Sequence, residues 1–267
     1  MKHKSKASVP SHADLVEIQR AWHSPGKHVA SVGIELEGGM DHSDLKKLVR
    51  YLDDNGLNVY YSKGEEPGLR VKSKNIPNAE IRFWNRQFAV AKDFIRYVYD
   101  DCDFKTNDNC GFHVHVRFSD MPQAVSIFSS PTVINSFVGL YKKEFRARRY
   151  RDRLHSMYCF DLDNVTMVLA QSGPELIYEK RTRINLGAYI EHGTIKFRIM
   201  PNQLSSAEAI KSLEWVVSTS ESLYARNLGR IVKDAKVSPQ IAMDHFFMVR
   251  EAPQERLAVA VDLCSRD

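Results

Sequence analysis

The sequence has no apolar run long enough to cross a membrane, and it contains little cysteine. Because a transmembrane helix needs about 20 mostly apolar residues, we expect no membrane partner. No apolar stretch follows the basic start of the chain, so it does not match a secretion signal, and we expect a cytoplasmic protein. The cysteines have no paired CxxC spacing, which predicts free thiols and no disulfide framework. They are Cys102, Cys110, Cys159 and Cys264.

The common motifs of several enzyme classes are missing as well. The chain has neither GxxxxGK[ST] nor GxGxxG, and it has no nucleophile elbow, so P-loop, Rossmann and serine-hydrolase functions have no support. With 43% hydrophobic and 27% charged residues, it has the composition of an ordinary globular protein. Its 267 residues show no internal repeat and no convincing linker. We therefore expect a flexible or loosely docked leader at 1–29 and a single domain at 30–267.

Two short segments, 33–37 and 110–116, alternate polar and apolar side chains. In a β-strand, successive side chains point to opposite faces of the sheet. Glu35 and Glu37 therefore share one face of their strand, and the apolar residues around them share the other. The same parity places His113, His115 and Arg117 on one face. The two carboxylates and two imidazoles become candidates for one sheet surface.

Three further segments, 79–84, 181–186 and 194–199, repeat this alternation. For any single strand the simpler interpretation is an antiparallel sheet with one solvated face, which alternates in the same way. Solvated faces, however, favour Thr, Lys, Ser and Gln, whereas Glu, His, Arg and Asn are the residues that bind anions and metals. The five segments together favour a site. The polar residues of the three added segments are Glu80, Arg82, Arg181, Arg183, Asn185, Thr194, Lys196 and Arg198.

The net charge of +5 is only a weak sign of an anionic partner. It is concentrated at residues 142–153, where seven basic residues accompany two acidic ones. Such a segment suits nucleic acid, a polyanionic substrate or nucleotide phosphates, and a solvated helix face explains it equally well. No homeodomain, zinc-finger or RNP signature supports the nucleic-acid interpretation.

Strand and helix signals alternate along the chain without a strict βαβ order. We expect additional strands at 57–61 and 69–73. Helices are expected after Asp41, at about 88–98, after Ser130, after Ser205 and at about 236–250. The three named residues are of types that cap helix N-termini. This mixture predicts an α+β fold in which helices cover one face of a mainly antiparallel sheet.

The polar faces carry the groups that phosphoryl transfer needs. Paired carboxylates bind Mg²⁺ or Mn²⁺, arginines clamp phosphates, and imidazole ligates a metal or donates to a phosphate oxygen. Zinc at Cys110, His113 and His115 is an alternative. It lacks a further ligand at a convincing spacing, and the Glu-rich surroundings suit hard cations better.

Four motifs follow one another along the chain: GIELE at 33–37, CGFHVHV at 110–116, RINL at 183–186 and GTIKFR at 193–198. In order and spacing they resemble the amidoligase family, which is similar to the carboxylate-amine ligases of the glutamine synthetase and glutamate–cysteine ligase superfamily. The resemblance covers about residues 31–225. It implies a curved sheet like that of the glutamine synthetase catalytic domain, with ATP and divalent metals on the concave face and helices on the other.

The resemblance also assigns roles to individual residues. The implied ligands of Mg²⁺ or Mn²⁺ are Glu35, Glu37, Glu80 and His113. Arg183 and Arg198 are implied to be catalytic by neutralising the transferring phosphoryl group, and Lys196 is a third catalytic candidate, which departs from the family pattern. The residues implied to contact nucleotide or substrate are His113, His115, Arg183 and Asn185.

The reaction that the resemblance implies is amide formation driven by ATP. The γ-phosphate of ATP is transferred to a substrate carboxylate, and an amine then attacks the acyl phosphate, so that ADP and phosphate are released. The partners are ATP, a carboxylate and an amine. The carboxylate or amine belongs to an amino acid, a peptide, a protein or, in phage and mobile-element settings, another macromolecule.

One position departs from the family pattern, since the usual TIEFR is here TIKFR, with Lys196 in place of glutamate. A charged lysine cannot ligate Mg²⁺ and repels a nearby cation. Three interpretations stay open: Lys196 replaces one metal as a fixed charge, Glu191 supplies the missing ligand, or catalysis has been lost. An altered active enzyme is favoured because the other ligand candidates remain. The competing function is a non-catalytic scaffold that binds a nucleotide, nucleic acid or partner through its basic face.

Overall fold

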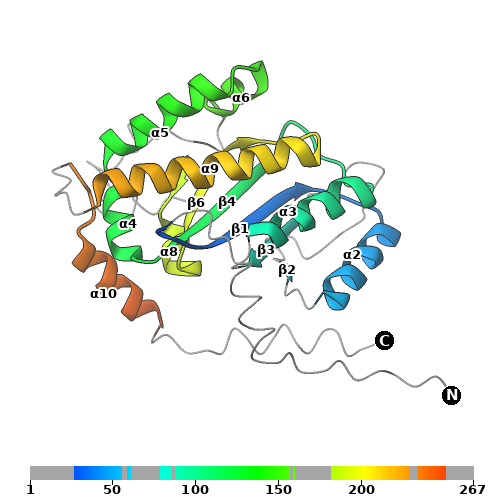
Figure 1. Ribbon diagram of the computed structural model, residues 1–267, viewed down its shortest axis with the longest axis horizontal. Coiled ribbons are helices and arrows are strands. Elements are labelled where there is room, and N and C mark those ends of the chain that lie inside the picture. Colours follow the sequence, from blue (N-terminus) through cyan, green and yellow to red (C-terminus); the bar gives the residue numbers. More distant parts are fainter. Residues whose placement is uncertain are drawn as a thin grey trace.

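The chain folds into an α+β structure with one antiparallel sheet, seen in a computed structural model (Figure 1). The structure describes residues 27–55, 59–61, 79–85, 88–156, 159, 182–228 and 234–250. Six strands lie in the order β2-β3-β1-β4-β6-β5, and every neighbouring pair is antiparallel. The strands are β1 Val29–Gly38, β2 Val59–Tyr61, β3 Ala79–Asn85, β4 Gly111–Phe118, β5 Ile184–Asn185 and β6 Ile195–Pro201. The predicted α+β class and antiparallel sheet are confirmed.

Three helices, α2, α5 and α9, begin where the capping residues predict. The helices are α2 His42–Asp54, α3 Phe88–Arg96 with the π-helical turn η1 Tyr97–Asp101, α4 Met121–Phe128, α5 Pro131–Glu144, α6 Arg148–Arg153, α8 Gly187–His192, α9 Ser206–Asn227 and α10 Pro239–Arg250. Asp41 Oδ1 accepts from the backbone N–H groups of Ser43 and Asp44 at 2.8 and 2.9 Å. Ser130 caps α5, and Ser205 caps α9. Each cap satisfies backbone donors that the first helical turn leaves without an internal partner.

The expected elements and the observed ones differ in a few places. Helix α4 was not predicted, although Asp120 caps it by accepting from the N–H of Gln123 at 3.0 Å. The strand expected at 181–186 shortens to the two residues of β5, and α8 follows at once. The strand expected at 69–73 and most of the leader at 1–29 lie outside the described residues. Within the described ranges no single helix is long and apolar enough to span a membrane, and α4 with α5 passes that test only as a pair bent by 77°.

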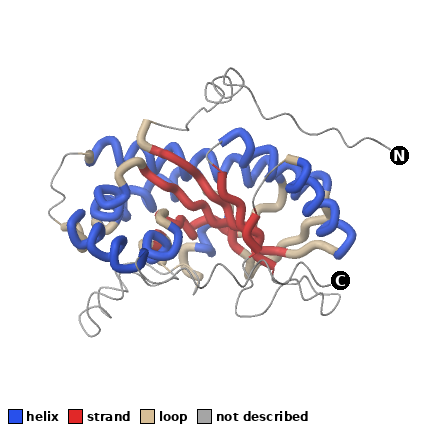
Figure 2. The backbone as a smooth tube through the Cα atoms, turned by 90° about the horizontal axis from the view of Figure 1, so that it is seen from below, coloured by secondary structure: helices blue, strands red, loops and turns tan. Residues whose placement is uncertain are grey.

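The apolar face of the sheet forms the core of the protein together with the helices. Val32, Ile34 and Leu36 of β1 are buried in one cluster with apolar side chains of β4, β6, α3, α4, α5 and α9. Phe197 of β6 stacks on Phe137 of α5 at a centroid distance of 5.0 Å. Figure 2 shows the strands in the middle of the molecule, flanked by helices. Since the helices use the apolar face, the polar side chains of the strands point to the opposite one.

Candidate functional site

The strand register brings the predicted polar residues together. Glu35 lies directly opposite His113 of β4, and His115 lies opposite Lys196 of β6. Residues that are directly opposite share a face of the sheet, so the parity predicted from the sequence is confirmed for these positions. On the other side of β1, the backbone of Glu37 pairs with that of Glu80, and the backbone of Glu35 pairs with that of Arg82.

The polar face at this point is buried, not solvated. Glu35, His113 and His115 are 0% exposed, and Lys196 is 7% exposed. An antiparallel sheet with a wet outer face would leave such side chains in contact with water. The simpler interpretation of the alternating pattern is therefore wrong for the centre of the sheet. Buried ionisable groups must be paired or hydrogen-bonded, because their desolvation is costly.

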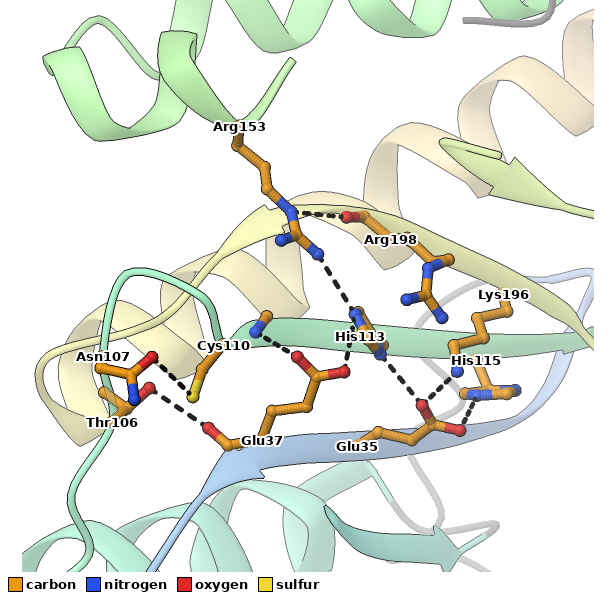
Figure 3. A network of polar contacts seen from close by, with 11 residues as sticks. Glu35, Glu37, Thr106, Asn107, Cys110, His113, His115, Arg153, Lys196 and Arg198 are labelled. Atoms are coloured by element: carbon orange, nitrogen blue, oxygen red, sulfur yellow. Dashed lines mark hydrogen bonds and ion pairs between the residues drawn. The ribbon is translucent and has the colours of Figure 1, made fainter. Parts of the chain in front are cut away.

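Glu35 is the centre of the network in Figure 3. Its Oε2 atom lies 3.0 Å from His113 Nδ1, and its Oε1 atom lies 2.8 Å from His115 Nε2. The Lys196 ammonium donates to Oε2 and forms an ion pair with it. Because a carboxylate only accepts, both imidazole nitrogens must carry their proton on the side that faces Glu35. One carboxylate therefore receives three donors.

The second nitrogen of each imidazole is consequently an acceptor. His115 Nδ1 accepts from the Thr194 hydroxyl at 2.9 Å, and His113 Nε2 lies 3.4 Å from Arg153 Nη2. Burial lowers the pKa of His113 well below its usual value, and the positive charges of Arg198 and Lys196 act in the same direction. Burial also lowers the pKa of His115, to about 4, against the opposing effect of Glu35. Both imidazoles are therefore neutral at neutral pH.

Glu37 lies at the more open end of the site, with a side chain that is 28% exposed. Its Oε2 atom accepts from the Gly111 N–H at 2.5 Å, and its Oε1 atom lies 3.6 Å from His113 Nε2. Burial raises the pKa of Glu37, while Arg198 and Arg153 partly oppose this shift. Glu37 is thus a carboxylate held beside cationic groups, with access to solvent that Glu35 lacks.

Arg153 is a site residue that the sequence analysis did not single out. It is 5% exposed, and its Nε–H donates to the Arg198 carbonyl at 3.3 Å. A Cβ atom on Gly111 would lie 2.5 Å from Arg153 Nη2 and 2.6 Å from His113 Nε2. Any side chain in place of the glycine of the CGFHVHV motif would therefore displace Arg153 or His113. No spacing signal distinguishes Arg153 from the six other basic residues of its segment.

Five of the six other basic residues of the segment lie at the surface, and Arg149 is half-buried. The segment includes the C-terminal end of α5 and the whole of α6. Its exposed basic residues are Lys142, Lys143, Arg146, Arg148 and Arg151. Its acidic residues are paired, because Glu144 contacts Lys211 at 2.8 Å and Asp152 contacts Arg148 at 3.3 Å. A solvated helix face describes these positions well, whereas Arg153 reaches into the site.

Arg183 and Asn185 are buried near the same site and hold neighbouring backbone in place. Arg183 Nη2 donates to the Leu154 carbonyl at 2.7 Å, and Asn185 Oδ1 accepts from the Ala188 N–H at 3.3 Å. Burial raises the pKa of the Cys159 thiol, and the charges of three arginines oppose this shift. The three are Arg153, Arg183 and Arg198. These guanidinium groups therefore gather on one side of the sheet.

Several cationic side chains lie around the two carboxylates of this cluster. Four cationic residues accompany two carboxylates, and the imidazoles are neutral. The cationic residues are Arg153, Arg183, Lys196 and Arg198. Guanidinium and ammonium groups are the side chains that bind phosphates and other anions.

The implied divalent metal does not fit at Glu35. Both carboxylate oxygens accept from nitrogen donors, and the Lys196 ammonium lies against Oε2. His113 turns a protonated nitrogen toward Glu35, so it cannot ligate a cation at that atom. Among the described residues, no three His, Cys, Asp or Glu side chains are grouped to hold a metal ion. The Cys110 thiol faces Asn107 Oδ1 at 3.4 Å and does not complete a zinc site with the histidines. The side chains of Glu80 and Glu191 lie outside the described part.

The two histidines should make the protein less stable in acid. The unfolded chain binds protons near pH 6.5, the ordinary pKa of histidine, whereas folded His115 binds one only near pH 4. A folded-state pKa below the unfolded value gives full stability above about pH 6.5, and this stability is lost as the pH falls toward 4. The loss is about 3 kcal/mol for His115. His113 acts in the same direction, and Glu37, with its raised pKa, acts in the opposite one.

Urea denaturation between about pH 4.5 and 7.5 measures this effect. A His115→Gln variant keeps an N–H donor for Glu35 but does not titrate, so its free energy of unfolding should depend less on pH. His155 is exposed on the chain after α6, and His155→Gln should leave the dependence unchanged. If the free energy of unfolding changes equally with pH in the wild type and both variants, His115 does not have a lowered pKa.

No protein-family model matches the chain, and no curated protein sequence matches it. Its function is therefore argued from the geometry of the buried cluster and from the four ordered motifs that lie within or beside it.

Proposed function

We propose that the chain is an ATP-dependent carboxylate-amine ligase of the amidoligase type, with a glutamine synthetase-like sheet whose polar face is concave and holds the active site. The observation that carries this proposal is the convergence of acidic, imidazole and cationic side chains from β1, β4, β6 and α6. These residues come from distant parts of the sequence, and three of the four family-like motifs contribute to the contacts. The guanidinium and ammonium groups of the cluster suit a polyphosphate.

In the first step, a substrate carboxylate oxygen attacks the γ-phosphorus of ATP and the bond to the β-phosphate oxygen breaks. Catalysis of phosphoryl transfer depends almost entirely on positioning and on fixed charges near the transferring group. Arg198 and Arg153 supply such charges, and their guanidinium groups match phosphate geometry. Lys196 adds a third charge from the neighbouring position on the same face of β6.

In the second step, an amine attacks the acyl carbon and phosphate leaves, so that an amide forms. The attacking nitrogen must lose a proton, and Glu37 is the carboxylate with solvent access and a raised pKa. A base with a pKa closer to neutrality accepts a proton more effectively. Glu35 holds both imidazoles and Lys196 in position for both steps. Mg²⁺ or Mn²⁺ enters as part of the ATP substrate, and neither step described here depends on a metal held by Glu35.

The proposal is tested by incubating purified protein with ATP, Mg²⁺ or Mn²⁺ and a pool of amino acids and peptides. Mass spectrometry should detect an amide product together with ADP and phosphate in equal amounts. Omitting the pool should abolish ADP release above the background without protein. ADP release that does not depend on any carboxylate or amine, or no ADP release with any pool, contradicts the ligase assignment.

A second candidate function is a non-catalytic scaffold that binds a polyanion. The observation that favours it is the exposed basic surface of α5 and α6, at the end of which Arg153 reaches the site. Phosphate contacts of this kind weaken steeply with salt, because binding releases condensed counterions. Affinity for DNA or RNA that falls by orders of magnitude over a salt series, without ADP release, would favour the scaffold.

A further inference from the structure

The contacts of Lys196 define an unusual environment for a lysine. The residue is 7% exposed, and its ammonium group lies against a carboxylate that is fully buried. The same carboxylate accepts N–H groups from two neutral imidazoles. A carboxylate surrounded by imidazoles is a common metal environment in proteins, yet here the central positive charge is an ammonium.

A buried carboxylate needs a positive charge beside it, and either a metal cation or an ammonium group can supply that charge. A divalent cation binds several carboxylate and imidazole lone pairs at once, whereas an ammonium supplies a single charge and only donates hydrogen bonds. In this site both imidazoles direct N–H groups, not lone pairs, toward Glu35. The hydrogen-bonding pattern is therefore arranged around an ammonium.

We propose that Lys196 takes the place of a divalent cation at Glu35, so that the protein binds a phosphate-bearing ligand without a metal ion at that carboxylate. The choice of a nucleotide as ligand rests on the proposed function, whereas the exchange of cation for ammonium rests on the contacts alone. Replacing Lys196 by glutamate should reverse the exchange. The buried site would then hold two adjacent carboxylates beside two imidazoles, and a divalent cation would offset their repulsion.

The test compares Lys196→Glu with Lys196→Gln, which removes the charge but adds no carboxylate. Mn²⁺ is titrated into each protein without nucleotide, and free Mn²⁺ is measured by electron paramagnetic resonance. Lys196→Glu should bind one more Mn²⁺ per chain than the wild type, at least about tenfold more tightly than Lys196→Gln. Equal Mn²⁺ binding by the two variants would overturn the proposal, as would a wild-type protein that already binds Mn²⁺ at Glu35.

Unfolding of Lys196→Glu in the absence of metal does not prevent the test. In that case Mn²⁺ should raise its melting temperature and leave that of Lys196→Gln unchanged, and an unchanged melting temperature in both would overturn the proposal. The wild type offers an independent measurement, because its affinity for ATP in EDTA should remain within about threefold of that in Mg²⁺. Binding that EDTA abolishes would overturn the proposal.

These measurements also separate this proposal from the ligase assignment. ATP binding in EDTA without any amide product supports the role of Lys196 and contradicts the reaction. Absence of ATP binding in both buffers contradicts the proposed function, and the Mn²⁺ comparison still decides whether Lys196 replaces a cation.

Discussion

Replacing Glu35 with glutamine should lower the free energy of unfolding by about 3 to 5 kcal/mol. The carboxylate is fully buried, and it is the ion-pair partner of the buried Lys196. The variant removes the carboxylate charge that lies against the ammonium, and it places an amide where two imidazole N–H groups need an acceptor. Urea denaturation at neutral pH measures the loss, since the shift in midpoint reports stability when the slope is unchanged.

A double-mutant cycle shows whether the loss comes from the pair. Lys196→Met alone should also lower the free energy of unfolding, because it removes the cation beside a buried negative charge. The loss in the double variant should be smaller than the sum of the losses in the two single variants. Asp93→Asn is the matched control, since Asp93 forms an exposed pair with Arg96 at 2.6 Å. Exposed pairs of this kind contribute about 1 kcal/mol or less. If Glu35→Gln lowers the free energy of unfolding no more than Asp93→Asn does, the buried pair does not stabilise the site.

Arg198→Ala should reduce kcat for ADP release about 100- to 1000-fold, which is typical for removing one group that stabilises transition-state charge. Arg198 lies on β6 two residues from Lys196, and its charge acts on both Glu37 and His113. In Figure 3 its guanidinium points toward the imidazoles. The rate is measured in a coupled assay with saturating ATP and a substrate identified by mass spectrometry.

The control for this rate loss is Arg226→Ala, which removes an exposed arginine near the end of α9 and should leave kcat unchanged. Arg198→Lys should recover part of the rate, because it restores the charge but not the planar fork. A rise in KM with unchanged kcat would indicate that Arg198 binds the ground state and the transition state equally and does not accelerate the chemical step. Unchanged kinetics in Arg198→Ala would remove it from the catalytic groups.

Much of the sheet could be predicted from the sequence because strand parity is a local property. Alternation alone placed Glu35 and Glu37 on one face of β1, and His113 and His115 on one face of β4. Helix starts were likewise local, since a capping side chain bonds to backbone only two or three residues away. Asp41, Ser130 and Ser205 therefore gave correct starts for α2, α5 and α9.

The contacts that give the site its chemistry could not be predicted in this way. Which strand lies beside which is set by packing over long sequence separations, so the partners of Glu35 were not determined by the pattern. The residues that meet there, Glu35, His113 and Lys196, come from three strands. Arg153 belongs to a run of similar residues, and only its place in the fold, at the end of α6 beside His113, distinguishes it. The alternation of side chains within a strand also does not predict which other parts of the chain pack against its polar face, so the burial of that face could not be predicted.

The most direct test of the account is the affinity for ATP of two arginine variants on α6. Arg153 is buried against His113, whereas Arg151 on the same helix is exposed. If the cationic cluster holds the phosphates, titration calorimetry should show that Arg153→Met binds ATP at least about tenfold more weakly than the wild type, since hydrogen bonds to charged groups contribute about 1.5–3 kcal/mol. Arg151→Met should bind ATP as the wild type does. Equal affinity of both variants and the wild type would contradict the account.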